Sequence, residues 1–251
     1  MMDLSLVSPA LWLAVLAAIS VGGLLKGMTG LGLPLFAVPA LAAITSVEDA
    51  VVLMVFPSVG ANLWLVINHR RYRNLLREHL PFLVTGFLGG LLGTGLLVLI
   101  SDRGLKLLLV IWLGLYLILY FSNRSSLKLF GASRKSGYPL GLAAGTIQGS
   151  TGISAQVVAP YYHARGLAPE AYAFAVAFTF LLFSVSQITA MTNLHLLTVN
   201  RIQLSLIALV PSLVFTRLGI SLSRKISIAV FNKFLLATFI LMEIKLIMDI
   251  L

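Results

Sequence analysis

The stretch KGMTG at residues 26–30 has a close copy, QGSTG, at residues 148–152. The two stretches lie 122 residues apart, and the same spacing matches Glu48 with Glu170 further along the chain. Each glycine-rich stretch interrupts sequence that is otherwise apolar enough for a membrane helix. The pattern indicates two diverged copies of one unit, each with a broken helix. Paired breaks of this kind mark the binding site in many transporters.

The composition places the chain in the membrane. Hydrophobic residues make up 59% of the 251 residues, charged residues make up 10%, and the mean hydropathy is +1.01. A soluble domain of this length needs far more polar surface. The net charge of +10 does not indicate nucleic-acid binding, because the basic residues fall in short loops between apolar segments. The sequence therefore predicts a multi-pass membrane protein with the lipid bilayer as its main partner.

The apolar segments predict an all-α fold with about eight to ten membrane segments in two repeats. The first repeat covers residues 1–122, a basic linker covers 123–137, and the second repeat covers 138–251. Arginines cluster at residues 69–79, so the positive-inside bias places this loop and the linker in the cytoplasm. Counting spans from there places both termini outside. The loop after the third segment is inside in the first repeat and outside in the second, so the repeats are predicted to be inverted.

A broken helix is tolerated in a membrane only where protein buries it or where it lines a cavity. The short helix after each break begins with free N–H groups and the positive end of the helix dipole. Two such helix starts that converge from opposite faces predict an anion site between the two broken helices. Close helix packing is the alternative explanation of the glycines alone. The residues assigned to this site at the breaks are Gly27, Thr29, Gly30, Gly149, Thr151 and Gly152.

Five further polar side chains are candidates for contact with the substrate. Lys26 adjoins the first break and could supply positive charge, or could extend to the cytoplasmic surface. Gln148 occupies the matching position in the second repeat, and Gln156 lies just after the second break. Arg217 is a second candidate for the charge, with the same alternative as Lys26. Asn62 is the weakest candidate, because interhelical hydrogen bonds explain most polar residues in membrane helices.

The sequence offers no enzyme site. It contains no cysteine, its four histidines lack metal-binding spacing, and no HExxH or GxSxG pattern is present. We therefore expect no cofactor, no metal and no catalytic residue. A coupling ion, H⁺ or Na⁺, is an expected partner of a transporter. Glu243 in the last apolar segment could relay protons or pair with Lys245 or Lys233, but no carboxylate is clearly placed for coupling by the sequence alone.

Taken together, these features resemble the TauE/SafE family of sulfite and organosulfonate exporters. The resemblance rests on KGMTGLG at residues 26–32 and QGSTGIS at residues 148–154, within two inverted halves. The family's breaks are often richer in glycine than the second one here, where Ser154 and Ala155 follow. The resemblance implies a carrier for small anions in the bacterial inner membrane.

The predicted function is secondary transport, in the export direction, of a small anion such as sulfite or sulfoacetate. The resemblance and the inverted repeats together imply alternating access to a site between the broken helices. Two alternatives stay open at this point. An anion channel would need a continuous polar stripe through the bilayer, whereas polarity here is concentrated at the centre. A non-transporting accessory protein would tolerate apolar substitutions at the breaks.

Overall fold

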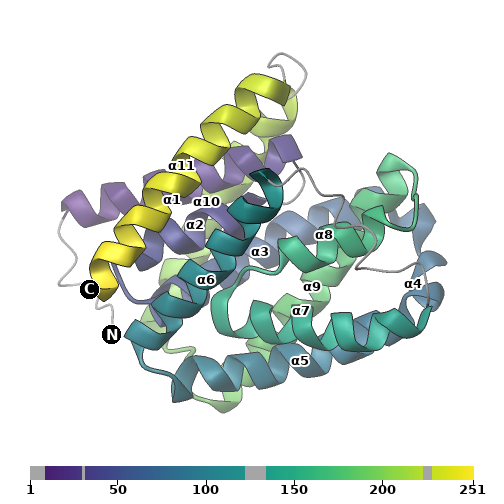
Figure 1. The fold of residues 1–251 in the computed structure, drawn as a ribbon, viewed down its shortest axis with the longest axis horizontal. Helices are drawn as coiled ribbons and strands as arrows, with labels where there is room; N and C mark the ends of the chain where they lie inside the picture. The colour runs from purple at the N-terminus through teal and green to yellow at the C-terminus, as the bar shows by residue number, and fades with distance from the viewer. Residues whose placement is uncertain (1–8, 30–31, 122–133, 223–227) are drawn as a thin grey trace. The chain divides into compact units, whose positions relative to one another are not determined.

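A computed structural model describes residues 9–29, 32–121, 134–222 and 228–251, and these residues are almost entirely helical, with no β-strand among them (Figure 1). Within these described residues, five helices, α1, α3, α5, α9 and α10, are long and apolar enough to cross a membrane. The prediction of an all-α polytopic membrane protein is confirmed. The α-helices are α1 (Pro9–Thr29), α2 (Gly32–Ala42), α3 (Val47–Asn68), α4 (Leu75–Glu78), α5 (Leu80–Leu99), α6 (Asp102–Phe121), α7 (Gly137–Thr151), α8 (Ala155–His163), α9 (Pro169–Asn193), α10 (Val199–Leu222) and α11 (Ile228–Ile250).

Helix ends recur with the spacing of the sequence repeat. Helix α1 ends at Thr29 and α7 ends at Thr151, 122 residues later. Helix α3 begins at Val47 and α9 begins at Pro169, again 122 residues later. This agreement supports the division into two repeats, which otherwise stays a prediction. Residues 123–133 of the predicted linker lie outside the described part of the chain.

The chain forms two compact units, and each unit contains helices from both predicted repeats. The first unit contains α1, α2, the start of α3 up to Pro57, α6, α10 and α11. The second unit contains α3 from Ser58 onward, together with α4, α5, α7, α8 and α9. Within the first unit α1 packs on α10 and α6 on α11, and within the second unit α5 packs on α7 (Figure 1).

Glycines at the two breaks bring helix backbones into direct contact. A Cβ atom on Gly27 of α1 would lie 2.1 Å from the carbonyl oxygen of Thr216 in α10. A Cβ atom on Gly149 of α7 would lie 2.5 Å from the carbonyl oxygen of Gly90 and from the backbone nitrogen of Thr94 in α5. The two threonines are themselves 122 residues apart. The same close crossing, which only small residues allow, is therefore present once in each unit.

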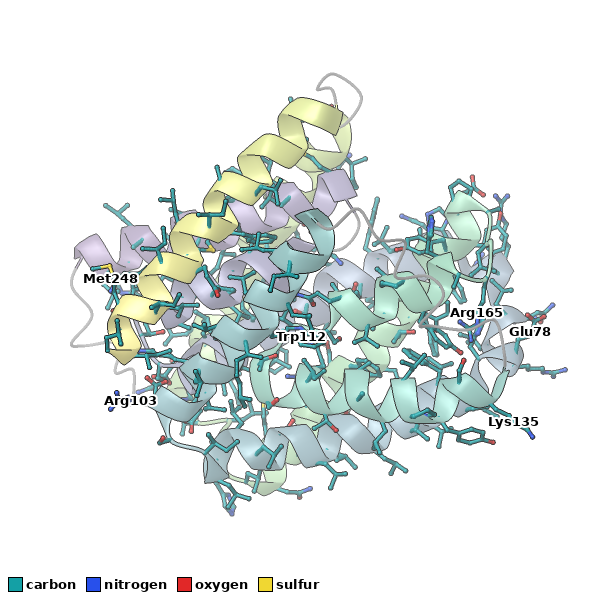
Figure 2. All side chains as sticks on the ribbon, viewed as in Figure 1. Glu78, Arg103, Trp112, Lys135, Arg165 and Met248 are labelled. Atoms are coloured by element: carbon teal, nitrogen blue, oxygen red, sulfur yellow. The ribbon has the colours of Figure 1, made fainter. Side chains whose placement is uncertain are left out.

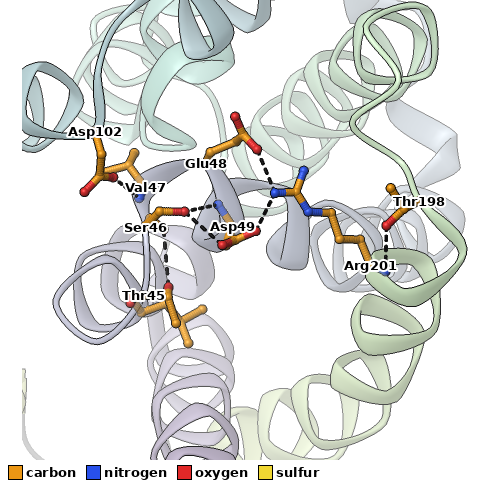
Figure 3. Close-up of polar contacts among 9 residues, drawn as sticks. Thr45, Ser46, Val47, Glu48, Asp49, Asp102, Thr198 and Arg201 are labelled. Carbon is orange, nitrogen blue, oxygen red and sulfur yellow. Dashed lines mark hydrogen bonds and ion pairs between the residues drawn. The ribbon is translucent and has the colours of Figure 1, made fainter. Parts of the chain in front are cut away.

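A buried ion cluster joins the two repeats within the first unit (Figure 3). Arg201, at the start of α10, donates to Glu48 at 2.7 Å and to Asp49 at 2.6 Å. Only 8% of the Arg201 side chain is exposed. Ser46 accepts a hydrogen bond from the backbone N–H of Asp49 at 3.0 Å, so Ser46 caps the start of α3.

The matching glutamate in the second unit forms an exposed ion pair. Glu170, at the start of α9, pairs with Arg71 and accepts a hydrogen bond from the Tyr72 hydroxyl at 2.8 Å. The exposed fractions of the Arg71 and Glu170 side chains are 67% and 52%. Glu48 and Glu170 thus serve as first-turn helix acids, each paired with an arginine from the other repeat.

An aromatic cluster encloses His79 at one end of the second unit. His79 is 4% exposed, its Nδ1 lies 3.4 Å from the Tyr161 hydroxyl, and its ring meets that of Tyr162 edge-on. Burial, and then the positive charge of Arg165, lower the pKa of His79 to about 4. Figure 2 shows Arg165 with Glu78 and Lys135 at the end of the unit where α7 begins. His79 is therefore held neutral at physiological pH.

We expect acid to destabilise the protein through His79. The unfolded chain protonates this histidine near pH 6.5 and the folded protein near pH 4, so the free energy of unfolding falls as the pH drops between these values. The full loss is up to about 3 kcal/mol, at about 1.4 kcal/mol per pKa unit. The measurement is the apparent Tm of detergent-purified protein from pH 7.5 to 4. His79→Gln should flatten this profile, whereas replacement of the exposed His163 by Gln should leave it unchanged; equal profiles for all three proteins would contradict the account.

Candidate functional site

The break between α7 and α8 is built by local backbone geometry. Gly152, with φ 72°, adopts the left-handed conformation that ends α7, and its N–H donates to the carbonyl oxygen of Gln148 at 2.8 Å. The Thr151 hydroxyl donates to the carbonyl oxygen of Ile147 at 2.7 Å and accepts from the N–H of Ile153 at 3.3 Å. The sequence predicted that this hydroxyl contacts substrate, and that role stays a prediction. In this structure the hydroxyl stabilises the turn.

Three buried polar side chains meet at this break. The Ser154 hydroxyl, one residue before α8, donates to Gln148 Oε1 at 2.8 Å. Gln148 Nε2 donates to Gln187 Oε1 of α9 at 3.4 Å, and Gln187 Nε2 donates to the backbone oxygen of Gln148 at 3.1 Å. We call Gln148, Ser154 and Gln187 the amide cluster. It places uncharged donors and acceptors next to the start of α8.

The amide cluster has the chemistry of an anion half-site. The start of α8 carries the positive end of the helix dipole and backbone N–H groups that have no partner four residues earlier in the helix. Gln156, the second residue of α8, is buried there. Amide and hydroxyl hydrogens can turn toward an oxyanion, and hydrogen bonds to a charged ligand are stronger than those to neutral groups. The cluster can therefore bind an anion without a positively charged side chain.

The break between α1 and α2 adds a positive charge in the first unit. Lys26 lies in the last turn of α1 and is only 2% exposed, so its ammonium group is enclosed by protein. An ionisable side chain within a membrane segment marks a candidate functional site. Thr29 is the last residue of α1, and its side chain lies outside the described part of the structure. Gly30, which also belongs to the predicted site, lies outside the described residues altogether.

The structure adds Thr216 of α10 to the first half-site. Thr216 is 6% exposed, and its hydroxyl has no hydrogen-bond partner among the described residues. The backbone oxygen of Thr216 is the atom that would lie 2.1 Å from a Cβ atom on Gly27. Gly27 directly follows Lys26 in the chain. The matching Thr94 in the second unit donates to the carbonyl oxygen of Gly90 at 2.8 Å. A buried hydroxyl without a partner costs about 1–3 kcal/mol, so Thr216 is suited to bind a ligand or water.

Two predicted site residues, Arg217 and Asn62, belong neither to the amide cluster nor to the half-site of Lys26 and Thr216. The Arg217 side chain is exposed on α10, whereas the neighbouring Thr216 is buried. Asn62 is buried in the second unit and donates to the carbonyl oxygen of Ser58 one turn earlier at 2.8 Å. The proposed contact of both residues with substrate stays a prediction. Within the described residues, no group of three or more His, Asp and Glu side chains is placed to hold a metal ion.

Sequence reasoning missed three residues of these half-sites, Ser154, Gln187 and Thr216. Interhelical hydrogen bonds explain most polar residues in apolar helices, and the bond of Gln187 to the α7 backbone is of that kind. The position of Gln187 beside the break depends on how α9 packs against α7, and the sequence does not show this packing. Thr216 matches Thr94 in the repeat, but its position beside Gly27 depends on the packing of α1 on α10, which the sequence does not show.

Comparison with known proteins identifies the family. No significant match was found among curated proteins or among solved structures. A family model, described as sulfite exporter TauE/SafE, matches residues 14–246 of the 251 residues. This match covers both half-sites and both compact units. The chain is therefore a multi-pass membrane protein that belongs to the TauE/SafE family of sulfite-exporter-type transporters.

Proposed function

We propose that this protein is a secondary transporter that exports a small anion, either sulfite or an organosulfonate such as sulfoacetate, and that it is not an enzyme. The observation that carries the proposal is the amide cluster of Gln148, Ser154 and Gln187, which is buried beside a helix break in a membrane protein. A polar cluster at a break is costly to place in a membrane segment unless it serves a ligand or a buried contact.

Each break contributes one half-site to the proposed function. In the second unit the amide cluster and the start of α8 bind oxyanion oxygens. In the first unit Lys26 supplies charge and Thr216 supplies a hydroxyl. The hypothesis from the sequence repeat, that one anion lies between the two broken helices, stays a prediction. Alternating access through inverted repeats is the mechanism that this arrangement favours.

The proposed orientation follows from the loops. We place the protein in the bacterial inner membrane, with residues 69–79 and 123–137 in the cytoplasm and both termini outside. The contact of Arg201 with Glu48 supports one part of this topology. It joins the starts of α3 and α10, and the positive-inside count places these two positions on the same side.

Ligand-dependent stabilisation of the purified protein tests the proposal. The panel contains sulfite, sulfate, sulfoacetate, taurine, isethionate and small carboxylates, each added to detergent-purified protein in a thermal-shift assay. An anion at 100 times its Kd stabilises the folded state by about 2.7 kcal/mol. We expect one class, sulfite or sulfonates, to raise the apparent Tm selectively.

Gln148→Leu should weaken this stabilisation. Removal of one buried amide that binds a charged ligand costs about 1.5–3 kcal/mol, or roughly a 10- to 100-fold increase in Kd. The matched control is Gln203→Leu, because Gln203 is exposed on α10. If anions raise the apparent Tm of both variants equally, Gln148 does not bind the anion. No response of the wild-type protein to any anion would contradict binding of these ligands and favour the accessory role.

A further inference from the structure

Glu243 places a half-buried carboxyl group where α11 packs against α6 in the first unit. Its Oε1 lies 3.1 Å from the position that a Cβ atom on Gly114 of α6 would occupy. Its Oε2 is fully buried and has no hydrogen-bond partner among the described residues. In Figure 2, Met248 of α11 and Arg103 of α6 lie at the same end of the unit, so the two helices run antiparallel. Glu243 and Gly114 therefore meet along the middle of this helix pair.

Charged groups on the helices around Glu243 have partners elsewhere or lie at helix ends. On α11, Lys245 pairs with Asp249. On α6, Asp102 pairs with Lys106 in the first turns, and Arg103 is exposed beside them. Helix α2, which also packs on α11, carries no titratable residue. The side chains of Lys233, Tyr116 and Tyr120 lie outside the described part of the structure.

An ionised carboxylate in this position is costly. A buried charge without a partner costs several kcal/mol, whereas the protonated carboxyl group is uncharged and needs only modest polar contact. Carboxyl groups among the apolar helices of a membrane protein commonly mark ion or proton pathways. Among the described residues Oε2 has no hydrogen-bond partner, and protonation removes the charge without any ligand from the protein.

We propose that Glu243 is the proton-binding residue that couples anion transport to the proton gradient. One proton binds a carboxylate oxygen to give the neutral acid when the group is enclosed by α6 and α11. The same proton leaves to water when the carboxyl group becomes hydrated during the transport cycle. This inference rests on the proposed transport function, and it names H⁺ as the coupling ion.

Transport by Glu243→Gln in proteoliposomes tests the proposal. Labelled sulfoacetate is followed in two assays, accumulation driven by an imposed pH gradient and exchange against internal sulfoacetate at equal pH. Glutamine mimics the neutral acid but cannot release a proton. Accumulation should fall by about 5- to 150-fold, the range of typical coupling energies, while exchange stays near the wild-type rate. The control is Asp249→Asn, which removes a carboxylate from the same helix and should retain both activities.

The outcomes separate this inference from the proposed function. If wild-type protein neither accumulates nor exchanges any anion of the panel, the proposed function itself fails. The role of Glu243 is overturned if accumulation by the wild-type protein does not depend on the pH gradient, or depends on a Na⁺ gradient. It is also overturned if Glu243→Gln retains accumulation driven by the pH gradient. Loss of exchange together with accumulation in folded Glu243→Gln also overturns it, because Glu243 then serves substrate binding or structure.

A second variant keeps the carboxyl group and changes its surroundings. Gly114→Ala adds a methyl group against Glu243 Oε1 and should move the pH midpoint of anion accumulation. The control is Gly95→Ala, because a Cβ atom there meets no atom within 4 Å. An unchanged midpoint in Gly114→Ala would overturn the proposal even if Glu243→Gln could not be purified in folded form.

Discussion

Arg201→Met is expected to lower the free energy of unfolding by about 3–5 kcal/mol, because it leaves two carboxylates without their buried partner. Arg201 donates to both Glu48 and Asp49, and the exposed fraction of its side chain is only 8%. The remaining charges would repel each other at the start of α3. The apparent Tm of the detergent-purified protein should fall by roughly 10 °C, by the usual relation between free energy and Tm.

The repeat provides a matched control for this variant. Arg71 pairs with Glu170, the counterpart of Glu48, but both side chains are more than half exposed. Exposed ion pairs contribute at most about 1 kcal/mol, so Arg71→Met should change the Tm by only a few degrees. A similar small change in both variants would show that water, rather than protein, surrounds the Arg201 cluster.

Gly27→Ala and Gly149→Ala are expected to disrupt the two helix crossings. A Cβ atom would lie 2.1 Å from the Thr216 backbone oxygen in the first case and 2.5 Å from the Gly90 oxygen in the second. Backbone atoms cannot move aside as a flexible side chain can, so the helices must separate. We expect a loss of about 2–3 kcal/mol for each variant, and loss of transport because the breaks adjoin the half-sites.

Fluorescence-detected size-exclusion chromatography after heating measures this effect as the remaining fraction of monodisperse protein. Gly95→Ala is the control, because it adds the same methyl group in open space and raises helix propensity. If Gly27→Ala and Gly149→Ala both behave like this control, α1 does not cross α10, and α7 does not cross α5, at the distances seen in the structure.

Local features of the fold were predictable from the sequence. Apolar segments of membrane length, the glycine-rich breaks and the helix cap at Ser46 depend on residues close together in the chain. The observed ends of α1 and α7, at Thr29 and Thr151, keep the spacing of the sequence repeat. The packing of α1 on α10, and of α5 on α7, was not predictable, because helices with apolar faces all round give no periodic signal for a particular neighbour.

The candidate site was predictable in its position but not in its contacts. The sequence pointed to the breaks and to Lys26 and Gln148, and the structure buries both side chains. The contact of Gln187 with Gln148 arises from the packing of α9 on α7, which the sequence alone does not show. Thr151 illustrates the reverse case, because its hydroxyl bonds the local backbone and sequence alone does not distinguish a turn-stabilising hydroxyl from one that binds a ligand.

Uptake of labelled sulfoacetate and sulfite into proteoliposomes tests the central claim most directly. The account predicts uptake that saturates with substrate, that is accelerated by unlabelled anion inside the vesicles, and that falls roughly 10- to 100-fold at subsaturating substrate in Gln148→Leu but not in Gln203→Leu. Uptake equal to that of protein-free liposomes would contradict transport of these anions. Rapid uptake that neither saturates nor responds to internal anion would contradict a carrier and identify a channel.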